Sequence, residues 1–285
     1  MENYKLLGHK VGIKILDENT LENIFPMYQS MMNKINECRD VASKNTGWFG
    51  KRHYQYNFMY DNVFSILGKR GTGKTSVAFS LKEIIENSVE NPNDVVLPII
   101  IPEVIPENCT ILGWLLAVIK EEVENLENQI KKQKTTGYEK REDYWDNCRH
   151  SDEIGNLSEK LKQLSRMVFA GKYNPANENS YYKAVGNSAV QADDYYQFAN
   201  EIAEFWDMWI KAIQDLDIQT NSDNNNCPLI YFIFDDVDLS PEKIGELLSV
   251  IIKYLSHPNL IVITTADEQL FLDVLENRLD ILIPL

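Results

Sequence analysis

The sequence is poor in cysteine and contains no closely spaced cysteine pair. Its four cysteines, Cys38, Cys109, Cys148 and Cys227, lie far apart and form no C-x-x-C motif. This usage fits free thiols in a reducing compartment and predicts no disulfide framework. Cys148 lies close to His150, but a zinc site needs a second ligand pair at suitable spacing, and the sequence has none. We therefore interpret the proximity of these two residues as chance.

Long apolar runs are also missing. No stretch approaches the roughly 18 uninterrupted apolar residues that indicate a membrane-spanning helix. The chain begins MENYKLLGHK, which lacks the apolar core of a signal peptide. These two absences predict a cytoplasmic protein with no membrane partner.

Basic residues are few relative to acidic ones. The chain of 285 residues carries 28 Lys and Arg against 43 Asp and Glu, a formal net charge of −15. Such acidity argues against a broad nucleic-acid-binding surface, which needs clustered Lys and Arg. Residues 1–60 differ, with eight Lys and Arg against six Asp and Glu. If the protein has an anionic partner such as nucleic acid, we expect it to bind at this segment.

What the chain does contain is typical of a folded α/β protein. Apolar residues make up 44% and charged residues 25%, and the length fits one large domain or one domain with a substantial insertion. Apolar runs predict buried strands over residues 63–67, 229–234 and 260–265. Residues 95–101 predict a further strand, in which Pro98 indicates an edge or irregular position. The run at 281–285 predicts a last strand, and a chain that ends there suggests a piece of a longer protein.

Helical periodicity occupies the segments between these runs. Apolar residues at helical spacing predict helices over residues 75–85, 111–130, 157–168, 198–216, 241–255 and 268–277. Ser240 is a suitable N-cap for the fifth of these, with Pro241 at its first position. The aromatic residues of 198–216 are expected to face a core rather than a partner. We therefore predict an N-terminal segment (1–60), a core (61–110 and 227–285) and a helical insertion (111–226).

The strongest motif follows the first apolar strand. Residues 68–75 match G-x-x-x-x-G-K-[ST], between a predicted strand and a predicted helix, as a phosphate-binding P-loop requires. Glycines let backbone N–H groups turn toward phosphates, and the helix N-terminus adds the positive end of its dipole. Lys74 is expected to reach the β- and γ-phosphates of ATP, and Thr75 to bind Mg²⁺. The predicted nucleotide-binding residues are Gly68, Lys69, Arg70, Gly71, Thr72, Gly73, Lys74, Thr75 and Ser76.

A second acidic motif ends the apolar strand at 229–234. Asp235 and Asp236 follow it, in the pattern known as Walker B, which holds Mg²⁺ and orients the attacking water in phosphoryl transfer. We assign Asp235 to the metal and Asp236 to the water. Asp236 is shorter than the Glu common at this position, which leaves the rate of hydrolysis open. Asp238 is interpreted either as a loop cap or as part of the site.

Hydroxyl side chains end the strand at 260–265. An open α/β sheet places its ligand at the carboxyl ends of its strands, so Thr264 or Thr265 is a candidate for sensing the γ-phosphate. The alternative is that a residue here caps the following helix. Asp267 is equally able to provide that cap.

The order of these motifs resembles that of the additional-strand P-loop ATPases, which include the AAA+ and STAND families. The resemblance covers about residues 61–285 except the insertion, and it implies a parallel sheet with strand order 5-1-4-3-2. Residues 234–243, FDDVDLSPEK, look especially like the Walker B region of KAP-type and STAND-like bacterial ATPases. The sequence Arg278-Leu279-Asp280 resembles the AAA+ segment whose arginine reaches a neighbouring subunit. It implies that Arg278 is an arginine finger and that the active form is a homo-oligomeric ring.

Large bacterial ATPases of this type are similar to those of antiphage defence systems. They include the ATPase component of RADAR systems, which works with an adenosine deaminase. The resemblance therefore implies an ATPase of antiviral defence that acts with an effector protein. Two alternatives stay open on the residues alone: a nucleotide-gated scaffold with little hydrolysis, and a motor stimulated by nucleic acid.

Overall fold

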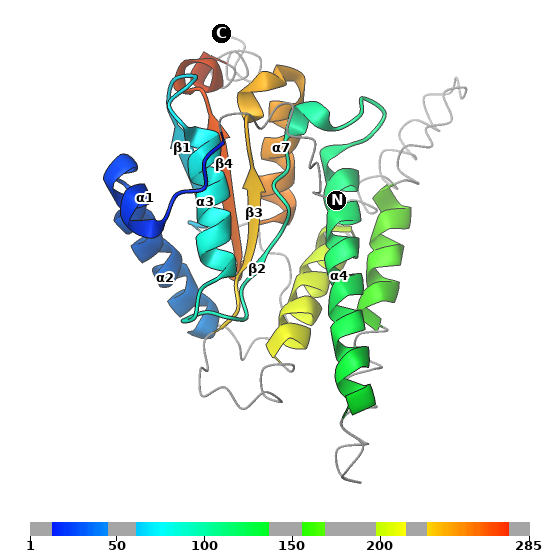
Figure 1. Ribbon diagram of the computed structural model, residues 1–285. Helices are drawn as coiled ribbons and strands as arrows, with labels where there is room; N and C mark the ends of the chain where they lie inside the picture. Colours follow the sequence, from blue (N-terminus) through cyan, green and yellow to red (C-terminus); the bar gives the residue numbers. More distant parts are fainter. Residues whose placement is uncertain (1–12, 45–60, 137–155, 169–197, 215–226, 274–285) are drawn as a thin grey trace, which may run out of the picture.

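A parallel β-sheet forms the centre of the protein. In a computed structural model, which describes residues 13–44, 61–136, 156–168, 198–214 and 227–273, four strands pair in the order β1-β4-β3-β2. These strands are β1 (Val63–Leu67), β4 (Leu260–Ala266), β3 (Ile230–Phe234) and β2 (Val95–Val96). Every neighbouring pair is parallel (Figure 1). The predicted α/β class with a parallel sheet is confirmed, whereas the strand predicted at 281–285 lies outside the described residues.

The strand predicted over 95–101 is much shorter than expected. Its ladder with β3 covers Val95 and Val96 only, and a single isolated bridge then joins Ile100 to Phe234. Pro98 lies between these two contacts and has no N–H group to donate, so the ladder cannot run through it. The predicted irregularity at Pro98 is therefore correct, but the predicted length was wrong.

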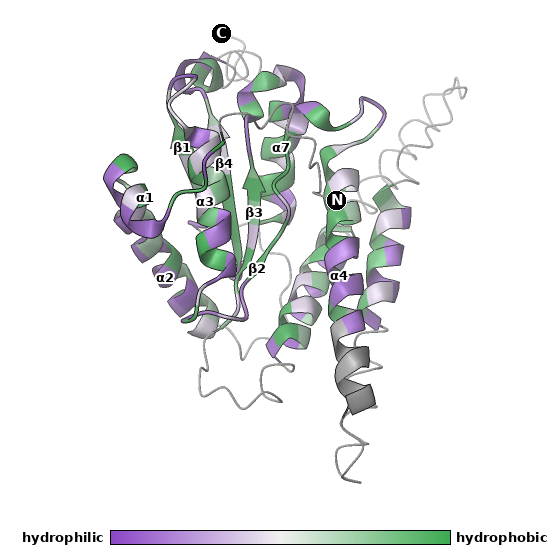
Figure 2. Cartoon of the chain, in the orientation of Figure 1, coloured by the Kyte–Doolittle hydropathy of each residue, from purple (hydrophilic) through white to green (hydrophobic). Residues whose placement is uncertain are grey.

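The apolar residues of the central strands alternate between two cores. Both β3 and β4 are buried along their whole length, and Figure 2 shows β3 as a hydrophobic strand. Successive side chains of a strand point to opposite faces of its sheet. One core accordingly receives Ile230, Phe232, Phe234, Leu260 and Val262, and the other receives Tyr231, Ile233, Ile261 and Ile263.

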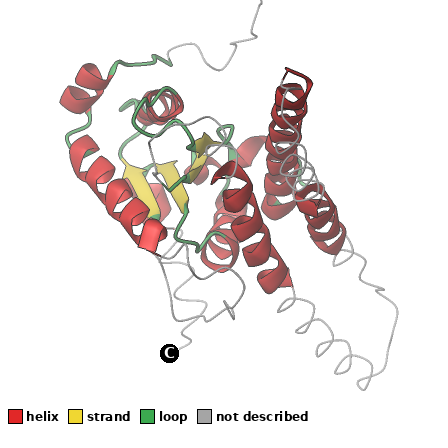
Figure 3. Ribbon diagram, turned by 90° about the horizontal axis from the view of Figure 1, so that it is seen from below, coloured by secondary structure: helices red, strands yellow, loops and turns green. Residues whose placement is uncertain are grey.

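Helices cover both faces of the sheet (Figure 3). Along the chain, α1 (Glu18–Ile24), α2 (Tyr28–Lys44) and α3 (Lys74–Glu86) supply the core that contains Tyr231. The other core is built from α4 (Ile111–Thr136), α7 (Pro241–Tyr254) and the helices at 156–168 and 198–214. Both faces must be covered because the central strands are apolar on both sides.

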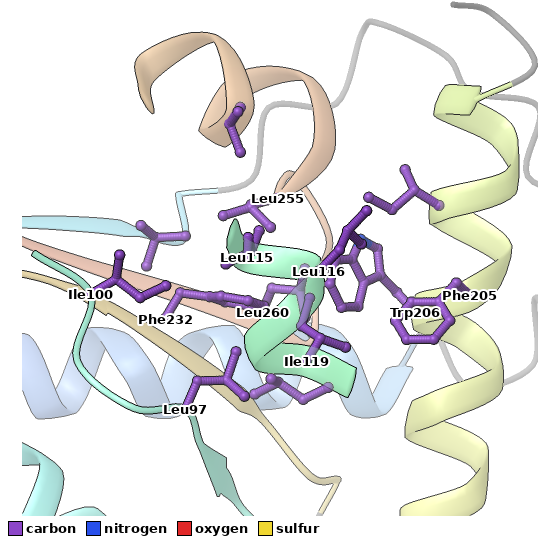
Figure 4. Close-up of a cluster of buried hydrophobic side chains, with 14 of the residues drawn as sticks. Leu97, Ile100, Leu115, Leu116, Ile119, Phe205, Trp206, Phe232, Leu255 and Leu260 are labelled. Atoms are coloured by element: carbon purple, nitrogen blue, oxygen red, sulfur yellow. The ribbon is translucent and has the colours of Figure 1, made fainter. Parts of the chain in front are cut away.

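The helix at 198–214 attaches to the sheet through its aromatic residues. Trp206 is 1% exposed, and its ring lies edge-on to that of Phe232 with ring centroids 5.7 Å apart (Figure 4). Its indole Nε1–H donates to the Tyr254 carbonyl oxygen at 2.9 Å, which satisfies the polar atom of this buried side chain. The prediction that the aromatic residues of this helix face a core is confirmed.

A buried ion pair lies at the amino end of β3. Both Nη atoms of Arg39 on α2 donate to the two carboxylate oxygens of Asp94, at 2.8 and 2.6 Å. The hydroxyl of Tyr231 and the amide of Leu229 donate to the same carboxylate. Burial, and then the charge of Asp94, raise the pKa of Tyr231 well above its ordinary value, so the phenol keeps the proton that it donates. These bonds fasten α2 to the sheet.

None of the helices in the described part of the chain is long and apolar enough to cross a membrane.

Replacing Arg39 with Ala should lower the free energy of unfolding by about 3–5 kcal/mol, because it leaves the Asp94 carboxylate buried without its counter-charge. The side chains of this pair are only 10% and 3% exposed. Lys34→Ala is the matched control, since Lys34 pairs with Glu37 in the same helix at 60% and 63% exposure and should cost less than about 1 kcal/mol. Urea unfolding of both variants measures the difference; equal losses would contradict the prediction.

Candidate functional site

The loop between β1 and α3 is shaped by two glycines. Gly71 and Gly73 have φ angles of 80° and 90°, a region that other residues enter only with strain. The loop folds back on itself: the Thr72 hydroxyl donates to the Lys69 carbonyl oxygen at 2.8 Å. Lys74, which is 8% exposed, donates from Nζ to the carbonyl oxygens of Gly68 and Lys69 at 2.8 and 3.1 Å. The ammonium group is thus held inside the loop that carries the motif.

The loop leads directly into the N-terminus of α3. Gly73 is the N-cap residue, and no side chain provides a capping hydrogen bond there. The first N–H groups of a helix have no partner within the helix, and a capping side chain usually accepts from one of them. A helix N-terminus without such a cap offers its N–H groups and dipole to an anion.

Asp235 reaches the same edge of the sheet from the end of β3. It is fully buried, and its amide donates to the Ile100 carbonyl oxygen at 2.9 Å. Its carboxylate oxygen Oδ1 accepts from the Thr75 hydroxyl at 3.4 Å and from the hydroxyl of Thr265. The structure therefore brings the start of α3 together with the ends of β3 and β4, through side chains that the sequence predicts to act together.

The second oxygen of Asp235 is a candidate ligand for a cation. Among the described residues, Oδ2 is buried and has no hydrogen-bond partner. An unpaired carboxylate oxygen in a protein interior is costly, and a cation is one way to satisfy it. No cluster of three or more His, Cys, Asp or Glu in the described ranges is arranged to hold a metal. A Mg²⁺ ion bound to Asp235 and Thr75 would therefore take its remaining oxygens from phosphate and water, as Mg²⁺ commonly does.

Thr265 holds Asp235 rather than facing an open space. Its side chain is fully buried; the hydroxyl donates to Asp235 Oδ1 and accepts from the Asp236 amide at 3.0 Å. The hydroxyl of Thr264 lies 2.9 Å from that of Ser65 on β1. Both hydroxyls of the strand end thus have protein partners, and Thr265 has the closer link to the acidic motif.

Asp236 adopts a backbone conformation that is uncommon among non-glycine residues. Its φ of 52° and ψ of 45° are left-handed, and among described non-glycine residues it is the only one with positive φ. Asp and Asn tolerate this region better than most residues. Burial, and then the neighbouring Asp235 and Asp238 carboxylates, raise the pKa of Asp236, with Lys74 and Arg70 acting in the opposite direction. A raised pKa brings a carboxylate closer to the range useful for accepting a proton.

Asp238 and Asp267 join the acidic loop to the loop of β1. Asp238 lies in the 3-10 helix η3 (Val237–Leu239), is 6% exposed, and accepts from the Asp267 amide at 2.9 Å. Asp267 Oδ1 accepts from the Gln269 amide at 3.1 Å, so of the two candidate caps it is Asp267 that caps the following helix. Its other oxygen accepts from the Arg70 amide at 3.1 Å, a contact that no spacing in the sequence predicts.

Other predicted residues have different surroundings. The Ser76 hydroxyl accepts from the Lys14 amide at 3.2 Å, on the N-terminal segment. Ser240 occupies the predicted N-cap of α7 but makes no capping hydrogen bond with its side chain, so only the helix start was predicted correctly. Arg278, Cys148 and His150 lie outside the described residues.

Replacing Thr265 with Val should destabilise the protein by about 1–3 kcal/mol, because the Asp235 carboxylate loses a donor and the Asp236 amide its acceptor. Thr265→Ser keeps the hydroxyl and removes one methyl group, for a cost of about 1 kcal/mol. Unfolding by urea without nucleotide compares the two variants. A Val variant no less stable than the Ser variant would show that the hydroxyl does not hold these groups.

The pKa of Asp236 predicts a pH-dependent effect of Asp236→Asn. Because this pKa is raised on folding, ionised Asp236 lowers stability as the pH rises from about 4 toward neutrality. Asn stays neutral, so the variant should gain stability relative to the parent over this range. Because Asp and Asn differ in how well they tolerate the left-handed backbone, the substitution also changes the free energy of unfolding by an amount that does not depend on pH. Urea unfolding from pH 4 to 7 in EDTA separates the two; a constant difference would contradict the prediction.

Comparison with known proteins gives no match for this chain. No protein-family model matches the chain, and no curated protein matches it. The functional assignment therefore depends on the arrangement at the carboxyl edge of the sheet: a glycine loop that encloses Lys74, a helix N-terminus without a capping side chain, and a buried carboxylate beside Thr75.

Proposed function

We propose that this chain binds ATP with Mg²⁺ and hydrolyses it to ADP and phosphate, as a P-loop ATPase. The observation that carries the proposal is the approach of the Thr75 hydroxyl, in the first turn of α3, to within 3.4 Å of the Asp235 carboxylate at the end of β3. Lys74 would bind the β- and γ-phosphates, together with the amides of residues 71–75 at the start of α3. Asp235 and Thr75 would hold the metal, with Thr265 fixing the orientation of Asp235.

Each residue of the site would have a separate role in hydrolysis. Bound Mg²⁺ would supply positive charge that neutralises the phosphate oxygens. Asp236 would orient the attacking water and accept its proton, a role that its raised pKa supports. Lys74 would stabilise negative charge on the transferred phosphoryl group. The amides of the glycine loop would donate to the phosphate oxygens, and the less the loop rearranges on binding, the smaller the cost of reorganisation.

The finer fold that we propose is the additional-strand class, with strand order 5-1-4-3-2. In the described sheet β1 is an edge strand, and Val63 and Leu67 on it are 44% and 40% exposed. Residues 281–285 are apolar and would pair with this edge as the fifth strand. The helices between β2 and β3 would then constitute an insertion in the core.

The biological setting that we propose comes from the resemblance of residues 234–243 to KAP-type and STAND-like bacterial ATPases. On that basis the protein is a cytoplasmic ATPase of antiviral defence. It would form a ring in which Arg278 contacts the site of a neighbouring copy. Its effector would be a partner protein such as an adenosine deaminase.

A nucleotide-gated scaffold is the second candidate, favoured by the short Asp236 side chain. This side chain has one methylene fewer than Glu. The Asp236 backbone is also held by the hydrogen bond from its amide to the Thr265 hydroxyl, so the carboxylate has a limited reach. Size-exclusion chromatography with and without ATP, alongside phosphate release, separates the two. Assembly without phosphate release favours the scaffold.

Replacing Lys74 with Ala should weaken ATP binding by roughly 10- to 100-fold or more, because a charged hydrogen-bond donor to phosphate is lost. Asp236→Asn should leave binding intact and lower turnover by about 100-fold or more, the usual effect of losing a general base. Calorimetry and phosphate release measure the two effects. Lys82→Ala is the matched control, since Lys82 lies on the same helix and pairs with Glu86. Normal turnover in both site variants would refute the proposed function.

A further inference from the structure

Asp267 contacts three parts of the candidate site at once. Its Oδ2 atom accepts from the Arg70 amide in the glycine loop at 3.1 Å. Its own amide donates to Asp238 Oδ1 at 2.9 Å, two residues beyond Asp236. Its Oδ1 atom accepts from the Gln269 amide at 3.1 Å, at the start of the next helix. A single residue therefore connects the glycine loop, the acidic loop and the helix that follows β4.

Helix capping alone does not account for these contacts. Asp17, the N-cap of α1, uses both carboxylate oxygens on Thr20, three residues away. Asp267 commits one oxygen to its local cap and the other to Arg70, 197 positions away in sequence. The second bond crosses from the end of β4 to the loop after β1.

The glycine loop depends on few such restraints. Lys69, Arg70, Gly71, Thr72 and Gly73 are all exposed, so packing holds little of the loop. Gly68 is fixed by its amide, which donates to the Ala266 carbonyl oxygen at 3.2 Å. The bond from Arg70 to Asp267 extends this attachment into the exposed half of the loop. Restraining a loop before its ligand binds lowers the entropy lost on binding.

We propose that Asp267 is a positioning residue: it holds the glycine loop and the acidic loop in register, and so sets the efficiency of ATP turnover. The inference rests on the proposed function, and Asp267 itself need not touch nucleotide. Asp267 would restrain the glycine loop through the Arg70 amide. It would restrain the acidic loop through Asp238, which lies two residues after Asp236.

Asp267→Ser separates the positioning role from the cap. Serine is as good an N-cap as aspartate, but its side chain is too short to serve both Gln269 and Arg70. The amide that donates to Asp238 is unchanged. Asp17→Ser is the matched control, because it makes the same replacement at an N-cap that has no bond to the loop. Should Asp267→Ser fail to fold, Asp267→Asn tests the same bond, since an amide has only one accepting oxygen.

The first measurement needs no nucleotide. Hydrogen exchange of peptides covering residues 68–74, read by mass spectrometry, reports how often the loop amides open. We expect exchange about 10-fold faster in Asp267→Ser, as for loss of a hydrogen bond to a charged acceptor, and unchanged in Asp17→Ser. Equal exchange in the two variants would overturn the inference whatever the activity of the protein.

The second measurement is turnover of MgATP. We expect kcat/KM to fall by about 10-fold in Asp267→Ser and to stay within about 2-fold of the parent in Asp17→Ser, as for a displaced catalytic geometry. An active parent with unchanged kinetics in Asp267→Ser would overturn this inference alone. A parent that neither binds nor hydrolyses MgATP would instead overturn the proposed function.

Discussion

The buried carboxylate of Asp235 connects the parts of the site. Thr75 comes from the first turn of α3, Thr265 from the end of β4, and both donate to one oxygen of the carboxylate. Burying a carboxylate costs free energy that two hydroxyl donors offset only in part, since its other oxygen has no partner among the described residues. The geometry is therefore less stable than an apolar packing would be, and more suitable for binding a cation.

The sheet makes this arrangement possible because its strands are parallel and buried. The register sets Ser65 of β1 and Phe234 of β3 beside Thr264 of β4, so the three strands end at nearly the same level. Residues that follow the strands then meet without any long connection. Apolar helices on both faces leave the carboxyl edge as the place where these polar side chains gather, as is usual for open α/β sheets.

Much of this fold follows from local patterns in the sequence. Unbroken apolar runs predicted β3 and β4 to within a residue or two, and helical periodicity predicted α3, α7 and the helices between β2 and β3, because burial imposes these patterns. The loop glycines and Asp235 could be proposed as site residues because phosphate and metal binding need particular residue types at fixed spacing. The predicted length of β2 was wrong because Pro98, which has no N–H group to donate, interrupts the ladder despite the apolar residues around it.

The remaining contacts are long-range bonds between polar residues, which no periodicity marks. Arg39 and Asp94 look in sequence like ordinary surface residues, yet they form a buried bidentate pair. Thr264 or Thr265 was a candidate for sensing phosphate, with helix capping as the alternative. The pairing of Thr265 with Asp235 depends on the register of two strands. Asp267 was one candidate for the helix cap, and its second hydrogen bond joins residues 197 positions apart. Such pairings arise only when the chain has folded, so the sequence indicates candidate residues more readily than the hydrogen bonds between them.

The two edges of the sheet differ in how fully their polar groups are satisfied. At the amino edge, the Asn62 carboxamide donates to the carbonyl oxygens of Leu255 and Leu260, at 2.9 and 2.8 Å, and Arg39 joins α2 to Asp94. Arg39 Nε is the buried side-chain atom without a partner there among the described residues. At the carboxyl edge the unsatisfied groups are instead the Asp235 oxygen and a helix N-terminus without a capping side chain. The Asp235 oxygen favours a cation, and the helix N-terminus favours an anion. A metal-bound phosphate would satisfy both at once, which is why we propose a nucleotide with Mg²⁺ as the ligand rather than either ion alone.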